Sequence, residues 1–196
     1  MSKPESIKSS VWFFIAGAFA FITILTGSDP IAIPGAVITT LLLMAGMLSL
    51  RAGYGEKAGT FGKNILLLGV IGPILLVIVI AAITFMYGSG NTEVWTKGLW
   101  IGLFGGPAVV LPALTLFGLA ASRNKSMARM NWLPVFAGIW YPVVYFFLAG
   151  YLFTHNGKFP QVYYPVFQII FLIQFLALCA LGAFLVSDAT REVVTI

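Results

Sequence analysis

Charged side chains are scarce in this sequence. They make up 9% of the 196 residues, whereas hydrophobic residues make up 60%. A soluble globular domain carries about 25% charged residues, because its core needs a polar shell to stay dissolved. Too few charges are present here to form such a shell. The composition therefore excludes an ordinary soluble domain and predicts an integral membrane protein whose outer surface faces the lipid bilayer.

Cysteine and histidine are also scarce, with one residue of each type, Cys179 and His155. A single cysteine excludes a disulfide framework and a CxxC metal or redox pair within the chain. A lone histidine excludes haem held by two histidines of this chain, and with one distant cysteine it does not make a zinc site. We therefore expect neither a metal site nor a cofactor.

Long uncharged apolar runs are what the sequence has in abundance. Six of them reach the length of about 17 to 25 residues that a helix needs to cross the hydrocarbon core. They cover residues 11–28, 33–50, 64–87, 98–121, 132–154 and 161–186. Their connections are short, which favours antiparallel neighbours. The sequence therefore predicts an all-α integral membrane protein, with one transmembrane domain over residues 1–196 built as a six-transmembrane-helix up-down bundle.

Lysine and arginine are distributed unequally between the two sides that six crossings define. One side carries Lys3, Lys8, Arg51, Lys57, Lys63, Arg123, Lys125, Arg129 and Arg191, and the other carries Lys97 and Lys158. Because cytoplasmic loops carry the excess of basic residues, we expect both termini in the cytoplasm and the protein in the plasma (inner) membrane. The first run also resembles a signal peptide, but its small residues lie inside the apolar run, which favours an uncleaved helix.

Asp, Glu, Lys, Arg and His are all absent from the six runs. Inside a membrane such residues are the usual sign of an ion path, a proton relay or an active site. Their absence argues against proton-coupled transport through a buried carboxylate, a voltage sensor and a buried catalytic lysine. No GxSxG or P-loop motif is present either. We expect no catalytic residues and no enzymatic activity, and the scattered basic residues predict no nucleic-acid partner.

Glycine and proline interrupt several of the runs. Proline inside a helix removes one backbone hydrogen bond and bends the helix. Gly102 and Gly106 form a strip of small residues four apart, which lets another helix approach closely. We interpret seven positions as sites of helix kinking or packing. They are Gly72, Pro73, Gly102, Gly106, Pro107, Pro112 and Pro142.

Uncharged polar side chains gather in the last two runs and define the candidate ligand-binding site. Residues four apart share a helix face, so the tyrosines of the fifth run and the Tyr-Gln pair of the sixth mark two polar faces. Gln174 lies about 100 degrees away from the second face. Hydrogen bonding between helices and contact with a ligand both remain open. The candidate residues are Trp140, Tyr141, Tyr145, Tyr164 and Gln168.

Two functions from different classes fit these observations. The first is a small transporter or channel-like protein for a neutral or lipid-like substrate, with its site between the fourth, fifth and sixth helices. The second is a non-catalytic anchor or scaffold subunit, in which the Gly102–Gly106 strip or the cytoplasmic loops contact a partner. The lipid bilayer is the expected surrounding, and a homo-oligomer or a partner in a membrane complex stays open.

Overall fold

The computed structural model describes residues 11–20, 22, 29–87, 92–127, 131–140, 142–143 and 164–191. In these ranges the chain forms helices and short turns, and no strand occurs. The long helices are α2 (Asp29–Tyr54), α3 (Gly59–Tyr87), α4 (Thr92–Asn124) and α6 (Tyr164–Arg191). Two shorter helices cover Val11–Ala20 and residues 133–140. The all-α prediction is confirmed for this part of the chain, and its six helical segments match the number of apolar runs.

Four of the helices are long and apolar enough to cross a membrane. The candidate spans are Val37–Tyr54, Gly59–Val79, Gly106–Asn124 and Gln168–Ser187. With 33 residues, α4 extends over about 50 Å, more than the hydrocarbon core of about 30 Å. Helices also continue beyond the apolar runs, since α3 begins at Gly59 and α4 at Thr92. Backbone hydrogen bonding continues into the polar residues at a membrane surface, so hydropathy alone does not mark these helix ends.

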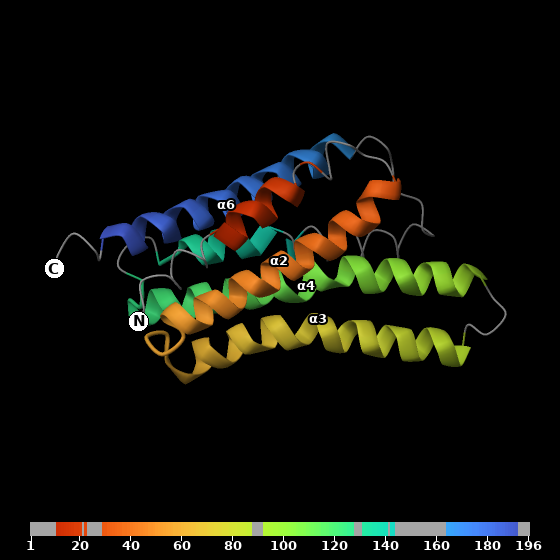
Figure 1. Ribbon diagram of the computed structural model, residues 1–196, viewed down its shortest axis with the longest axis horizontal. Helices are drawn as coiled ribbons and strands as arrows, with labels where there is room; N and C mark the ends of the chain where they lie inside the picture. Colours follow the sequence, from red (N-terminus) through yellow and green to blue (C-terminus); the bar gives the residue numbers. More distant parts are fainter. Residues whose placement is uncertain are drawn as a thin grey trace.

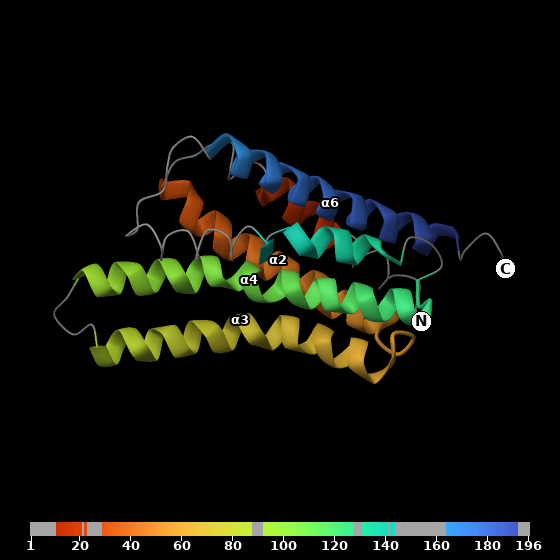
Figure 2. The same cartoon turned by 180° about the vertical axis from the view of Figure 1, so that it is seen from behind.

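The helices stack in layers, as Figures 1 and 2 show from opposite sides. The edges of the stack are α3 and α6, and the short helices Val11–Ala20 and 133–140 lie between α6 and the α2–α4 layer. Consecutive long helices α2, α3 and α4 run in alternating directions and contact one another. The short connections force this arrangement, because a connection of a few residues can only join helix ends on the same side.

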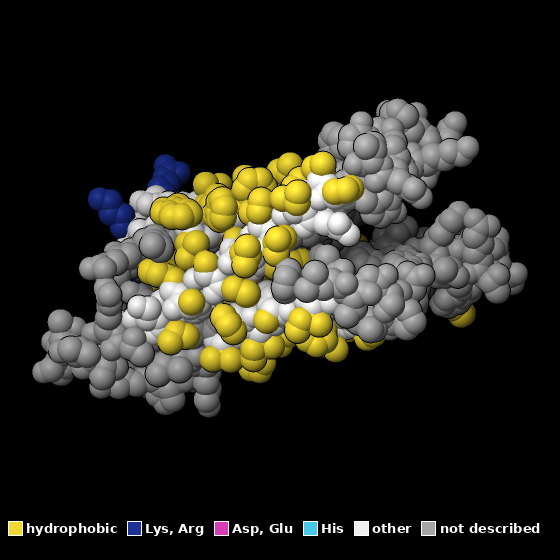
Figure 3. Space-filling model, turned by 90° about the horizontal axis from the view of Figure 1, so that it is seen from above, with side chains coloured by type: hydrophobic (Ala, Val, Ile, Leu, Met, Phe, Trp, Pro, Cys, Tyr) yellow, Lys and Arg dark blue, Asp and Glu magenta, His cyan; other side chains and the backbone are white. Residues whose placement is uncertain are grey.

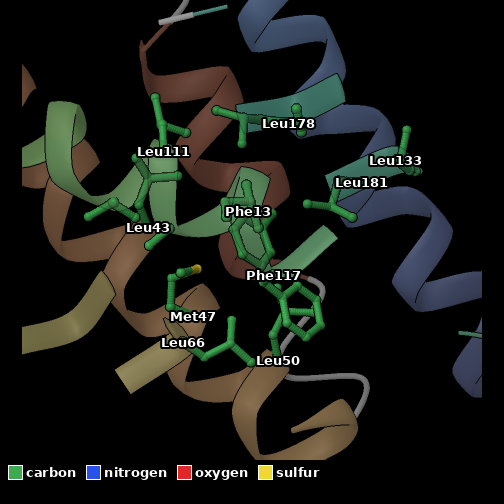
Figure 4. Close-up of a cluster of buried hydrophobic side chains, with 14 of the residues drawn as sticks. Phe13, Leu43, Met47, Leu50, Leu66, Leu111, Phe117, Leu133, Leu178 and Leu181 are labelled. Atoms are coloured by element: carbon green, nitrogen blue, oxygen red, sulfur yellow. The ribbon is translucent and has the colours of Figure 1, made fainter. Parts of the chain in front are cut away.

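The core lies where the layers meet, and Figure 4 shows its side chains converging. They come from Val11–Ala20, α2, α3, α4, the 133–140 helix and α6. Phe13 and Phe117 are fully buried, as is Met47. Phe13 packs against the backbone of α2 at Gly46, where its ring leaves no room for a side chain. Further fully buried side chains are Leu43, Leu50, Leu66, Leu111, Leu114, Leu178, Leu181 and Leu185. Dense packing of this kind holds helices together in a membrane, where water does not drive their association.

The outer surface is as apolar as the core. Along α3 the side chains of Leu68, Leu75 and Ile78 are 51–58% exposed, and those of Phe85 and Met86 are exposed further. Helices that are apolar all round have no polar face to turn towards water. An exposed surface of this composition is suited to contact with lipid chains rather than with solvent.

Candidate functional site

A fully buried glutamine connects α6 to the helix over residues 133–140. Gln174 has no exposed surface, and its Nε2 donates a hydrogen bond to the backbone carbonyl oxygen of Ala137. The surrounding side chains of α6, Ala177 and Leu178, are buried and apolar. A polar group inside a membrane protein needs such a partner, because the lipid offers none. Gln174 therefore fixes how α6 sits against the 133–140 helix.

Trp140 follows Ala137 by one helical turn and carries a second buried polar group. Its indole Nε1 is buried and has no hydrogen-bond partner among the residues that the structure describes. The ring is held edge-on by Phe136, with ring centroids 5.5 Å apart and an interplanar angle of 87°. Leaving a buried N–H donor unpaired costs about 1–3 kcal/mol. The indole N–H is therefore a suitable anchor for a ligand that carries a hydrogen-bond acceptor.

Of the other predicted ligand-binding residues, the structure describes the side chain of Gln168 alone. On α6 the side chain of Gln168 is exposed. Tyr141 and Tyr145 lie outside the described residues, and Tyr164 begins α6 with a side chain that lies outside them. The glutamine of α6 that faces the interior and bonds to Ala137 is thus Gln174. In the sequence analysis, Gln168 had instead been placed on the candidate ligand-binding face. Because α6 is apolar on every side, its hydropathy pattern does not indicate which glutamine faces the interior of the bundle.

Two glycines bring the 133–140 helix close to α4. A Cβ atom on Gly138 would lie 2.5 Å from the carbonyl oxygen of Leu111, and one on Gly118 would lie 3.0 Å from the carbonyl carbon of Pro134. On α4, Thr115 turns its hydroxyl back to donate to the Leu111 carbonyl oxygen at 3.1 Å. This close backbone contact positions Trp140 relative to α4. Both glycines were missed in the sequence analysis. Gly138 has a proline four residues away on either side, whereas Gly118 stands four residues before Ser122, a small-xxx-small spacing that could have identified it.

Gly106, by contrast, was singled out from the sequence and is now seen inside the chain. It is buried against Thr40 of α2, whose Oγ1 would lie 2.7 Å from a Cβ atom at this position. The side chain position of Gly102 lies outside the described residues. At Gly106 the strip therefore packs against α2 of the same chain. Docking of a partner protein on the Gly102–Gly106 strip stays a prediction.

Six of the seven predicted kink positions fall inside continuous helices, Gly72 and Pro73 in α3 and the other four in α4. Pro73 lies within α3, and Pro107 and Pro112 lie within α4. Pro73 and Pro107 are buried, whereas Pro112 and Pro142 are half-buried. Gly72 contacts Val109 of α4. Backbone groups freed by a proline can be satisfied by neighbouring helices in a membrane, so the helix continues through it.

Basic residues gather at the end of the bundle where α2 and α4 end and α3 begins. Figure 3 shows basic side chains at this end and apolar side chains over much of the described part of the visible face. Lys63 pairs with Glu56, and this hydrogen bond and charge lower the pKa of the Glu56 carboxyl. Asn124 ties α4 to the turn that precedes α3 by donating from Nδ2 to the carbonyl oxygen of Ala58 at 2.7 Å. This end of the bundle therefore carries a net positive charge.

Within the described residues, no group of three His, Cys, Asp or Glu side chains is placed to hold a metal ion. The buried polar groups of this site are two uncharged donors, Gln174 and Trp140, set among apolar side chains. No protein-family model, curated protein or solved structure matches this chain.

Proposed function

We propose that the protein is a small membrane transporter or channel-like protein for a neutral or lipid-like molecule, which binds between α4, the 133–140 helix and α6. The observation that carries the proposal is the buried Nε1 of Trp140, which has no partner among the described residues. Its donor matches an uncharged molecule with an acceptor, such as a carbonyl or hydroxyl oxygen. The predicted contacts from Tyr141, Tyr145, Tyr164 and Gln168 belong to this proposal.

We also propose that the chain crosses the membrane six times, with both termini in the cytoplasm of a plasma (inner) membrane. Supporting this orientation, Arg51, Lys57, Lys63, Arg123 and Lys125 lie at the bundle end where α2 stops, α3 starts and α4 stops. Cytoplasmic loops carry such an excess of basic residues.

Cysteine labelling tests this orientation. In a Cys179→Ala background, a cysteine at Lys97 is expected to react with a membrane-impermeant maleimide added to intact cells. Cysteines at Lys57 and Lys125 should react only after permeabilisation, because the positive-inside rule places them in the cytoplasm. The measurement is the labelled fraction of each variant before and after permeabilisation. The reverse pattern would show that the bundle is inserted the other way round.

Replacing Trp140 with phenylalanine tests the transport site. The change keeps an aromatic ring against Phe136 but removes the N–H donor, so we expect transport to fall about fivefold, the equivalent of one hydrogen bond. Suitable probes in proteoliposomes are fluorescently labelled phosphatidylcholine, followed by dithionite bleaching, and glycerol, followed by osmotic light scattering. The rate constant per protein is the measured quantity.

Trp132→Phe is the matched control, because Trp132 is 55% exposed and its ring packs edge-on against the same Phe136. Its transport rate should equal that of the wild type. Equal transport rates for Trp140→Phe and the wild type would rule out the proposed site. A wild-type protein that moves neither probe would count against transport of these substrates.

A non-catalytic scaffold subunit remains the alternative, and the outer half of α3 offers an apolar surface that a partner could cover in place of lipid. Phe85 and Met86 are 74% and 70% exposed there, and α3 contacts only α2 and α4 among the described long helices. A second membrane protein that co-elutes in stoichiometric amount after mild extraction would favour this function over transport.

A further inference from the structure

One strip of α4 faces outward from the bundle between two neighbouring helices. Leu116, Leu119 and Arg123 are exposed and share a helix face, because they follow three-four spacing. We call these three residues the α4 strip. It begins among apolar side chains and ends in an arginine at the basic end of the bundle.

The contacts of α4 show what flanks the strip. On one side, Ala113 and Ala120 approach Gly69 and Gly62 of α3. On the other side, Gly118 meets the backbone at Pro134 and Val135, at the start of the 133–140 helix. Figure 2 shows α4 lying between these two helices along its C-terminal half.

Both flanking helices add exposed apolar side chains of the kind that contacts acyl chains. On α3, Phe61 and Leu68 are 59% and 52% exposed, and they lie seven residues apart on one face. From the other helix, Trp132 and Ile139 are 55% and 40% exposed. Tryptophan favours the boundary between hydrocarbon and headgroups, so Trp132 marks the depth at which a headgroup lies.

The length of the surface matches one membrane leaflet. From Arg123 to Pro112, α4 rises about 16 Å, and half of the hydrocarbon core measures about 15 Å. A chain that starts beside Arg123 therefore ends near Pro112. No charged residue lies between Pro112 and Arg123.

The charges at the end of the strip are free to bind an anion. Arg123 and Lys125 are both exposed, and neither forms an ion pair within the described ranges. Among the side chains described at this end, the exposed acid Glu56 is engaged by Lys63. Arg123 and Lys125 thus offer positive charge at the depth of the phosphate groups of the cytoplasmic leaflet.

We infer that the α4 strip binds an anionic phospholipid of the cytoplasmic leaflet. Arg123 and Lys125 hold its phosphate-bearing headgroup, and an acyl chain lies along Leu119 and Leu116 between α3 and the 133–140 helix. The lipid fills the outward face of α4 and bridges two helices that approach α4 from different sides. The assignment to the cytoplasmic leaflet rests on the proposed orientation, whereas the lipid site itself does not depend on the transport proposal, because the strip lies on the outside of the bundle.

Native mass spectrometry of the delipidated full-length protein tests the inference. The probes are phosphatidylglycerol, phosphatidylcholine with the same acyl chains, and inorganic phosphate. Each basic side chain close to an anionic lipid contributes about fivefold in affinity. We expect phosphatidylglycerol to bind at least tenfold more tightly than phosphatidylcholine, and the Arg123→Gln/Lys125→Gln variant to lose about thirtyfold of its affinity for phosphatidylglycerol.

Two matched controls separate a site from general attraction. Lys63→Gln removes a cation at the same end of the bundle that is already paired with Glu56, so affinity should change less than twofold. Leu119→Asn should weaken phosphatidylglycerol binding about fivefold, whereas Leu48→Asn changes a comparably exposed leucine of α2 and should have little effect. Arg123→Lys should retain most of the lipid preference, since it keeps the charge.

Several results would overturn the inference. These are equal binding of the two phospholipids, an unchanged preference in the double variant, and equal losses in Leu119→Asn and Leu48→Asn. Displacement of phosphatidylglycerol by millimolar inorganic phosphate would assign a site for a soluble anion instead of a lipid.

Discussion

Replacing Gly138 with alanine is expected to lower the free energy of unfolding by about 3 kcal/mol, at the upper end of the cost of overpacking. The new Cβ atom would lie 2.5 Å from the carbonyl oxygen of Leu111 and 2.7 Å from the backbone nitrogen of Thr115. Both atoms belong to the backbone of α4, so no side-chain rotation relieves the clash. The 133–140 helix must move away from α4 as a whole.

The matched control is the same substitution at Gly69. There the added Cβ atom would meet the terminal methyl group of Met47 and would lie 3.1 Å from the Cβ atom of Ala113. Methionine adapts to a neighbour by rotating its side chain, so we expect a change of less than about 1 kcal/mol. Unfolding by sodium dodecyl sulfate in mixed micelles, followed by circular dichroism, measures both. Equal effects of the two substitutions would mean that Gly138 is not at a close helix crossing.

Gln174→Leu is expected to lower the free energy of unfolding by about 1.5 kcal/mol, near the largest value measured for a hydrogen bond between membrane helices. Leucine fills a similar volume, so packing is kept and the donated bond to the carbonyl oxygen of Ala137 is lost. The effect should be near the upper limit because Gln174 is fully buried and its described partner is a backbone atom.

Gln168→Leu is the comparison for this second prediction. Gln168 lies on the same helix and is exposed, so replacing it with an apolar residue should leave stability unchanged or raise it slightly in detergent micelles. The same unfolding measurement applies. If Gln168→Leu were the more destabilising of the two, the rotational setting of α6 in the structure would be contradicted.

Part of the candidate site could be predicted from the sequence. Uncharged polar residues in the fifth and sixth runs were visible as a pattern, and Trp140 is among the residues that the pattern selected. The inward glutamine was not predictable, because α6 is apolar around its whole circumference and either glutamine face fits a membrane. The packing of Gly106 on Thr40 likewise required the structure, since a strip of small residues serves a neighbour in the same chain and a separate partner equally well.

The sequence by itself determined that the chain is helical, with helices long and apolar enough to cross a membrane. Length and hydropathy decide this, because each unpaired backbone group in lipid is costly and a helix of about 20 apolar residues pairs them all. Only the tertiary structure decided which faces meet: Gly138 and Gly118 at the crossing with α4, Gln174 on Ala137, and Leu119 beside Arg123 on the outside. The physical reason is that lipid and protein interior are equally apolar, so hydropathy does not separate the inner face of a helix from the outer one, whereas close packing and buried hydrogen bonds do.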